Sequence, residues 1–133
     1  MTGVQTCALP ISTEDRGPVL TNGVAPAFTA KQSAAGKVAY NANCAVCHGS
    51  TMTNGTFGTP LGGTYFKTKW SNRSVRALFD RSKKTMPPAN PGSLSAETYA
   101  NILSHVLETN GMKPGAKPLP AGTDALNNMQ IGK

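Results

Sequence analysis

The stretch Cys44-Ala45-Val46-Cys47-His48 decides how the rest of the sequence is interpreted. Two cysteines three positions apart with a histidine directly after them form a haem-attachment pattern, in which each sulfur bonds the porphyrin and the histidine reaches the iron. A thioredoxin-type thiol pair would need a βαβ neighbourhood, which the sequence does not show. A tetrahedral zinc site would need four Cys or His ligands, and only Cys7 and His105 remain outside the motif. The motif therefore predicts one covalently bound haem.

The composition fits one small domain whose core needs a cofactor. Of the 133 residues, 14% are charged and 6% are aromatic, and the 14 Gly and 10 Pro residues predict long loops. The formal net charge of +7 favours an acidic partner surface, an anionic membrane face or nucleic acid. Nucleic acid is the weakest of these because no recognised binding motif is present. No apolar run reaches about 18 residues, so the sequence predicts no transmembrane segment.

The first residues, MTGVQTCALPI, resemble the translation of a common sequencing-library adaptor. We therefore expect residues 1–11 to be non-native and Cys7 to carry no function. The alternative is a short export signal, but its apolar region would be only a few residues long and no Lys or Arg precedes it. On this interpretation the true export signal was lost by truncation.

Between this segment and the motif, the sequence predicts an extended lead or linker over residues 12–30 and then a helix over 31–43. Gly36, Tyr40 and Cys44 recur at four-residue steps and therefore share one face of that helix. A glycine inside a helix costs about 1 kcal/mol relative to alanine. Gly36 thus favours close approach of another helix, with a surface glycine in a weak helix as the alternative.

The polar, glycine-rich residues 49–64 after the motif predict an irregular loop against one haem face. A backbone carbonyl within residues 58–63 is expected to orient His48, since iron-bound histidines usually donate their second ring nitrogen to such a group. Three aromatic residues then follow close together: Tyr65, Phe66 and Trp70. Trp70 there either donates its indole N–H to a haem carboxylate or serves as a partly buried anchor.

Two further helices are predicted in the second half of the chain. One runs from Ser74 to about Lys83 and ends before Met86-Pro87-Pro88, because a proline disfavours helical geometry in the residue before it. The other begins after the N-cap Ser95 and closes at Asn110-Gly111. The Pro-rich tail, residues 113–133, is expected to be non-helical, and three apolar residues in it are expected to pin it to the surface or to a partner: Leu126, Met129 and Ile131.

Met86 is the expected second iron ligand. It lies 38 positions beyond His48, far enough to reach the opposite face of the ring, and the two prolines after it restrict its loop. Met52 is too close to His48, whereas Met112 and Met129 lie at a helix end and in an unpatterned tail. His105 is expected to be a packed histidine at a helix interface, and Met86 as a core gap-filler is the alternative role.

The segment from about Lys31 to Gly111 resembles a single-haem class I cytochrome c. The resemblance rests on the first helix, CAVCH, the Pro60-Leu61 loop, the MPP loop and the last helix. It implies an all-α fold of three main helices, with the first and last crossing, around one covalent haem c. It also implies His48 and Met86 as axial ligands and the Pro60 carbonyl as the group that orients His48. The expected cofactor-binding residues are Cys44, Cys47, His48, Pro60, Leu61, Trp70 and Met86.

The resemblance divides the chain into a cytochrome domain over residues 31–112, with the lead before it and the tail after it. It implies a protein that works outside the bacterial cytoplasm, in the periplasm. His105 departs from the family, whose last helix commonly offers an aromatic residue to the helix crossing. A smaller and more polar ring at this position weakens the expectation of a tight contact there.

A narrower resemblance, through residues 66–70, MPP, PGSLS and LETNG, is to cytochrome domains that accompany pyrroloquinoline-quinone dehydrogenases. It implies an electron carrier rather than an enzyme, which passes electrons from a periplasmic dehydrogenase toward a terminal oxidase. The alternatives are a haem domain of a larger, truncated dehydrogenase and a haem enzyme or sensor with an open sixth position.

The stretch from Lys67 to Lys84 carries seven Lys or Arg residues and one Asp. We expect these charges to surround the haem edge and to attract redox partners with acidic docking surfaces. A solvated helix face that keeps the protein soluble is the alternative.

Overall fold

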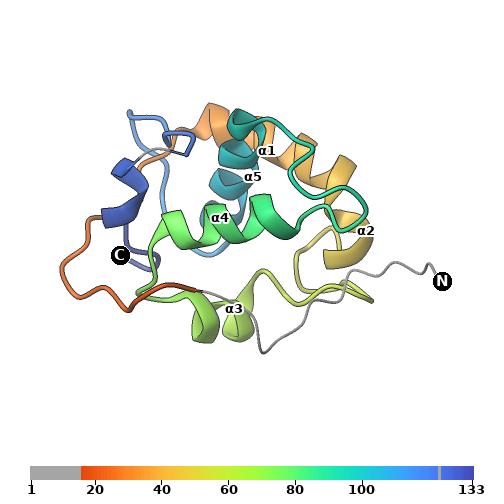
Figure 1. Ribbon diagram of the computed structural model, residues 1–133, viewed down its shortest axis with the longest axis horizontal. Helices are drawn as coiled ribbons and strands as arrows, with labels where there is room; N and C mark the ends of the chain where they lie inside the picture. The colour runs from red at the N-terminus through yellow and green to blue at the C-terminus, as the bar shows by residue number, and fades with distance from the viewer. Residues whose placement is uncertain (1–15, 123) are drawn as a thin grey trace.

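The structure is a set of helices joined by irregular segments (Figure 1). The computed structural model describes residues 16–122 and 124–133, so the predicted non-native segment lies outside the described residues. Apart from two isolated backbone bridges, the described residues form no β-structure, which confirms the all-α prediction. The elements are α1 (Ala30–Asn43), α2 (Ala45–His48), α3 (Gly63–Trp70), α4 (Val75–Thr85), α5 (Ala96–Thr109) and the 3₁₀ helix η2 (Asp124–Asn128).

Helices α1 and α5 pack across each other, and the three main helices expected from the sequence are α1, α4 and α5 (Figure 1). A capping box starts α1: the Thr29 hydroxyl accepts the Gln32 backbone N–H, and the Gln32 side chain accepts that of Thr29. Gly36 lies at the crossing, where an added Cβ would overlap the backbone carbonyl of Asn101 on α5. The close approach predicted at Gly36 is therefore confirmed.

Helix α4 leads into the Met86 loop. The helix predicted from Ser74 begins at Val75, and the Ser74 hydroxyl accepts the Ala77 N–H at 3.0 Å and caps it. The helix ends at Thr85, two residues later than predicted, and Met86 is already extended (φ −124°, ψ 145°). The proline after Met86 explains this sharp end.

Helix α3 is a correction to the sequence analysis, which extended the irregular loop to residue 64 and predicted no helix after it. Its N-cap Gly62 and first residue Gly63 are poor helix formers, so the start gives little sequence signal. Phe66 and Trp70, one turn apart, are buried and stack at a centroid distance of 6.5 Å. Burial of these two rings, rather than helix propensity, holds α3 in place.

The lead and the tail pack against the rest of the fold and against each other. Val24 and Met129 form a parallel bridge, and the Phe28 side chain is fully buried. The Val24 N–H donates to the Asn128 carbonyl at 2.8 Å, and the Gln130 N–H donates to the Val24 carbonyl at the same distance. Three apolar tail residues are buried, which confirms that they pin the tail to the surface: Leu126, Met129 and Ile131.

Candidate functional site

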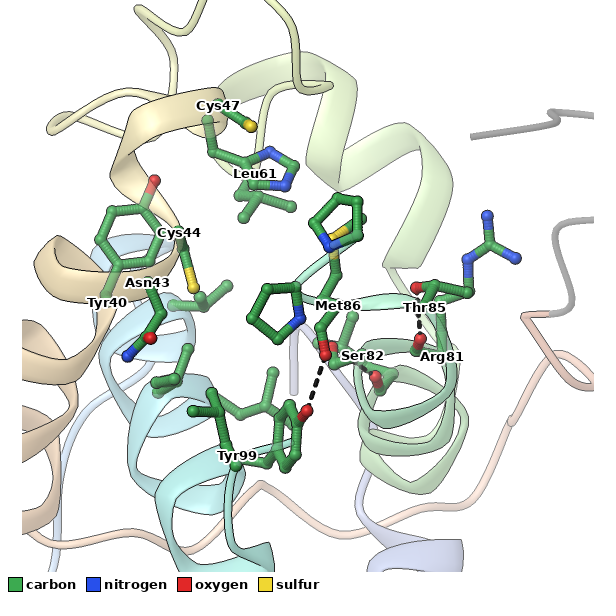
Figure 2. Close-up of a pocket in the computed structure, with 18 of the residues that line it drawn as sticks. Tyr40, Asn43, Cys44, Cys47, Leu61, Arg81, Ser82, Thr85, Met86 and Tyr99 are labelled. Carbon is green, nitrogen blue, oxygen red and sulfur yellow. Dashed lines mark hydrogen bonds between the residues drawn. The ribbon is translucent and has the colours of Figure 1, made fainter. Parts of the chain in front are cut away.

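An open cavity lies where α1, α2, α4 and α5 converge, and it contains the CAVCH motif (Figure 2). It contains about 870 Å³ of space when the region open to solvent is included. Figure 2 shows Cys44 and Cys47 on one side and Met86 on the other. Apolar residues from α4, α5 and the segment between them line this cavity: Leu78, Leu94, Ile102, Leu103 and Val106.

The motif folds as one helical turn. The Cys44 N–H donates to the Tyr40 carbonyl at 2.7 Å, so the motif continues from the end of α1. The His48 N–H donates to the Cys44 carbonyl at 3.0 Å, which closes the turn. Since residues three and four apart lie on one helix face, Cys44, Cys47 and His48 all line the cavity, whereas Val46 is 81% exposed.

The His48 ring is held by the loop that follows it. Its Nδ1 lies 2.7 Å from the Thr59 carbonyl oxygen, so a proton on Nδ1 would leave the Nε2 lone pair for a metal. Burial lowers the pKa of His48, and the Thr59 hydrogen bond opposes this effect only in part. The neutral ring is the form that binds iron.

Thr59, rather than Pro60, supplies the carbonyl, which corrects the expectation drawn from the family resemblance. The Leu61 N–H donates to the Met52 carbonyl at 2.8 Å and turns the loop so that the Thr59 carbonyl faces the ring. Leu61 lines the cavity and Pro60 does not. Gly58 leaves room for the ring, since an added Cβ would come within 2.5 Å of His48 Nδ1.

Met86 is held through its backbone. Its N–H donates to the Ser82 carbonyl at 2.8 Å, and its carbonyl accepts the Tyr99 hydroxyl from α5 at 2.6 Å (Figure 2). Pro87 and Pro88 line the cavity beside it. The Met86 loop is thus fixed to both α4 and α5.

The competing ligands named from the sequence do not reach the cavity. Among the methionines that the structure describes, Met52, Met112 and Met129 are absent from its lining. His105 is absent as well and instead packs edge-on against the Tyr40 ring, at a centroid distance of 5.6 Å. The prediction that His105 is a packed interface histidine is confirmed.

Trp70 and Arg81 complete the cavity lining. Trp70 is 5% exposed and packs on Phe66, so it is a buried anchor beside the cavity. Whether its indole N–H also donates to a haem carboxylate stays a prediction. Among the described residues, Arg81 alone contributes a Lys or Arg side chain to the cavity wall.

The two cysteines differ in their surroundings. Burial raises the pKa of the Cys44 thiol to about 11, so this sulfur is protonated at neutral pH. The Cys47 side chain is buried and also lines the cavity. A thioether to haem forms from a reduced thiol, so attachment through Cys47 requires that form.

The seven Lys and Arg residues between Lys67 and Lys84 do not all lie beside the cavity, which corrects the expectation that their charges surround it. Arg76 pairs with Asp80 at 3.1 Å and with Asp124 at 3.5 Å. Arg73 donates to the Gly17 carbonyl in the lead. Arg81 lines the cavity, and the exposed Lys83 and Lys84 lie in the last turn of α4 beside the Met86 loop.

The prediction that a carbonyl within residues 58–63 orients His48 is confirmed by Thr59, but sequence reasoning missed the roles of Gly58 and Tyr99. The sequence places Tyr99 in an apolar helix stripe, and such a stripe does not reveal which backbone group its hydroxyl reaches. Gly58-Thr59-Pro60 carried a usable signal, since a glycine for close approach directly precedes a carbonyl in a turn.

The described part of the chain gives no sign of another metal centre, since it groups no three His, Cys, Asp or Glu side chains around a common point. None of its helices is long and apolar enough to cross a bilayer.

Comparison with known proteins identifies the cofactor that this cavity binds. Residues 31–106 match the family model described as "Cytochrome C oxidase, cbb3-type, subunit III", over more than half of the chain. No curated protein and no solved structure matches. Cytochrome c domains bind haem c covalently, and the residues present fit this group: two cysteines and a histidine on one wall, a methionine on the other, and an apolar lining. The cofactor is haem c with its iron.

Proposed function

Because the chain belongs to the cytochrome C oxidase, cbb3-type, subunit III family, we propose that it is a single-haem class I electron carrier with His48 and Met86 as axial ligands. The observation that carries this proposal is the position of Met86. Of the methionines that the structure describes, it alone lines the cavity that holds Cys44, Cys47 and His48. An iron with both axial positions filled exchanges electrons without binding a substrate.

The haem supplies the redox chemistry, because its iron takes up and releases one electron. The chain controls the environment of that reaction. Thr59 orients the neutral His48 ring, while Tyr99 and Ser82 fix the backbone of the Met86 loop. The apolar wall lowers the polarity around the haem, and this wall together with methionine ligation favours a raised reduction potential.

The carrier is proposed to work in the periplasm, between a dehydrogenase and a terminal oxidase. The family description supports the oxidase side, since it names an oxidase subunit. The resemblance to cytochrome domains of quinoprotein dehydrogenases supports the donor side. A haem domain of a larger dehydrogenase is the second candidate, which the same resemblance to cytochrome domains of quinoprotein dehydrogenases supports.

A reductive titration followed by absorbance tests the proposed ligation. We expect one reversible one-electron transition and no spectral change when carbon monoxide is added to the ferrous protein. Rapid carbon monoxide binding to the wild type would instead identify an open sixth position, and thus the haem enzyme or sensor.

Partners with acidic docking surfaces are proposed from the net charge of +7 and from Lys83 and Lys84 beside the Met86 loop. Opposite charges can raise association rates about 10- to 1,000-fold at low salt. Hexacyanoferrate(III), an anionic oxidant, serves as the test reagent. Its reaction should slow as salt is raised, and Lys83→Glu with Lys84→Glu should slow it about tenfold at low salt.

Lys113→Glu with Lys117→Glu makes the same change of net charge in the exposed tail and is the matched control. A smaller effect of this control would locate the attraction beside the cavity. Equal effects of the two pairs would mean that only the net charge matters.

A further inference from the structure

A second cavity lies between α3, the end of α5 and the last residues of the tail. It contains about 540 Å³ of space when the region open to solvent is included. Among the described residues, none that lines it also lines the haem cavity. The covalent cofactor therefore does not account for this second cavity.

The tail forms one wall of the second cavity and is fixed there. The Gly132 N–H donates to the Met112 sulfur at 3.5 Å, and the Asn72 N–H donates to the Ile131 carbonyl at 2.9 Å. The Ile131 side chain is buried in the core. Met112, Ile131 and Gly132 all line the cavity, so the packing of the fold sets the shape of this wall.

Asn110 brings a hydrogen-bond acceptor without a donor to this cavity. Its side-chain nitrogen donates to the carbonyls of Leu61 and Val106, both at 2.8 Å, and so uses both of its protons. Its Oδ1 is buried, and no donor from the described residues reaches it. Leu61 and Val106 line the haem cavity and not the second one, so Oδ1 is the end of the amide that remains for the second cavity. Because a buried acceptor without a donor is unfavourable, an occupant that donates a hydrogen bond would be favoured there.

Two other kinds of surface line the same cavity. Phe66 and Ile131 are buried apolar side chains that can pack against a ring. Lys67, in the last turn of α3, is exposed, so its ammonium group can reach an anion at the opening to solvent. No Asp or Glu is among the described residues that line the cavity. The lining therefore suits a molecule with an apolar middle, a hydrogen-bond donor and a negative charge.

We propose that this cavity binds a small organic acid with an apolar middle, a hydroxyl at one end and a carboxylate at the other. The hydroxyl donates to Asn110 Oδ1, and the carboxylate pairs with Lys67. The apolar part packs against Phe66 and Ile131, as is usual in ligand sites. Phe66 also stacks on Trp70, which lines the haem cavity, so this pair of rings joins the two cavities. The inference does not depend on the proposed electron transfer.

Binding of 4-hydroxybenzoate to the haem-loaded protein, measured by calorimetry, tests the proposal. For a probe of this size we expect a dissociation constant of about 1 mM or lower. Benzoate lacks the hydroxyl and should bind about tenfold more weakly, because Asn110 Oδ1 stays unpaired. Phenol lacks the carboxylate and should bind about threefold more weakly, since an exposed ion pair contributes less. In NMR spectra, the shifts caused by 4-hydroxybenzoate should centre on the Asn110 side-chain amide and the Gly132 N–H.

Lys67→Met should weaken 4-hydroxybenzoate binding about threefold and leave phenol binding unchanged, because it removes only the charge. Lys69→Met is the matched control: it removes the same charge from the same helix, at a residue that does not line the cavity. This control should leave the affinity for both probes unchanged. The proposal would be overturned by equal binding of benzoate and 4-hydroxybenzoate, by equal effects of the two lysine variants, or by no binding at about ten times the expected dissociation constant. None of these results would affect the proposed carrier function, which depends on the reversible titration and the closed sixth position.

Discussion

The two walls of the cavity hold His48 and Met86 in different ways. On one wall, the Thr59 carbonyl contacts the His48 ring itself at 2.7 Å, and Gly58 packs against the same ring. On the other, the Tyr99 hydroxyl contacts the backbone carbonyl of Met86, and the thioether side chain keeps its own rotatable bonds. The histidine is oriented at the ring, whereas the methionine is positioned only through the chain that carries it. We therefore expect Met86 to dissociate from the iron more readily than His48.

The largest effect should come from the cysteines, which lie on the histidine wall. Acid and organic solvent should not extract haem from the wild type, whereas Cys44→Ala combined with Cys47→Ala should allow complete extraction, because no thioether remains. Either single variant should keep one weaker attachment. Met86→Ala is the comparison from the opposite wall and should keep its haem. Extraction of haem from the wild type would contradict the assignment of covalent haem.

The next largest effect should come from replacing Met86 on the opposite wall. Met86→Ala should abolish the weak long-wavelength ferric absorption band of methionine ligation, lower the reduction potential and admit carbon monoxide and cyanide. His105→Ala should change none of these, since His105 packs against Tyr40 outside the cavity. If the histidine variant had the effects expected of the methionine variant, the ligand assignment would be wrong.

A matched pair of tyrosines compares the supports of the two walls. The Tyr99 hydroxyl donates to Met86, and the Tyr40 hydroxyl donates to the Gly49 carbonyl at 2.6 Å. Tyr99→Phe and Tyr40→Phe should each cost about 0.5–1.5 kcal/mol of stability, because each removes one hydrogen bond from a carbonyl that keeps a backbone donor, the Gly92 N–H at Met86 and the Met52 N–H at Gly49. Only Tyr99→Phe should also weaken the methionine band and allow carbon monoxide to bind. Equal binding to both variants would mean that Tyr99 has no particular role in holding Met86.

The smallest effect should be a pH dependence from His105. Burial and, after it, the charge of Lys37 lower the pKa of His105 below its ordinary value of 6.5, while Glu108 opposes them. Between these two pKa values the unfolded chain binds a proton that the folded chain refuses, so stability should fall as pH drops through that range. Thermal unfolding of the haem-loaded protein between pH 5 and 8 measures this, and His105→Gln should flatten the curve. If the variant lost stability more steeply than the wild type as the pH falls, the role assigned to His105 would be wrong.

The sequence alone predicted the parts of the fold that have a regular apolar pattern or a recognisable motif. The apolar stripe of α5, the cap at Ser95 and the close approach at Gly36 follow from periodicity and residue chemistry. Helix α3 was missed because two buried rings hold it, and local propensity does not show burial. The carbonyl behind His48 was placed one residue too late, since no sequence pattern shows which peptide group of a turn faces inward. The division of the cationic stretch was missed because Arg76 pairs with the distant Asp124.

The bridge between Val24 and Met129 joins positions from opposite ends of the described chain. Every residue that lines the cavity lies between Tyr40 and Val106, inside the loop that this bridge closes. Closing so long a loop carries an entropic cost, although this cost grows only slowly with length. During synthesis the cavity residues leave the ribosome well before residue 129, so haem attachment has no need to wait for the final closure. Removing the last few residues would therefore release both chain ends and leave every cavity residue in place.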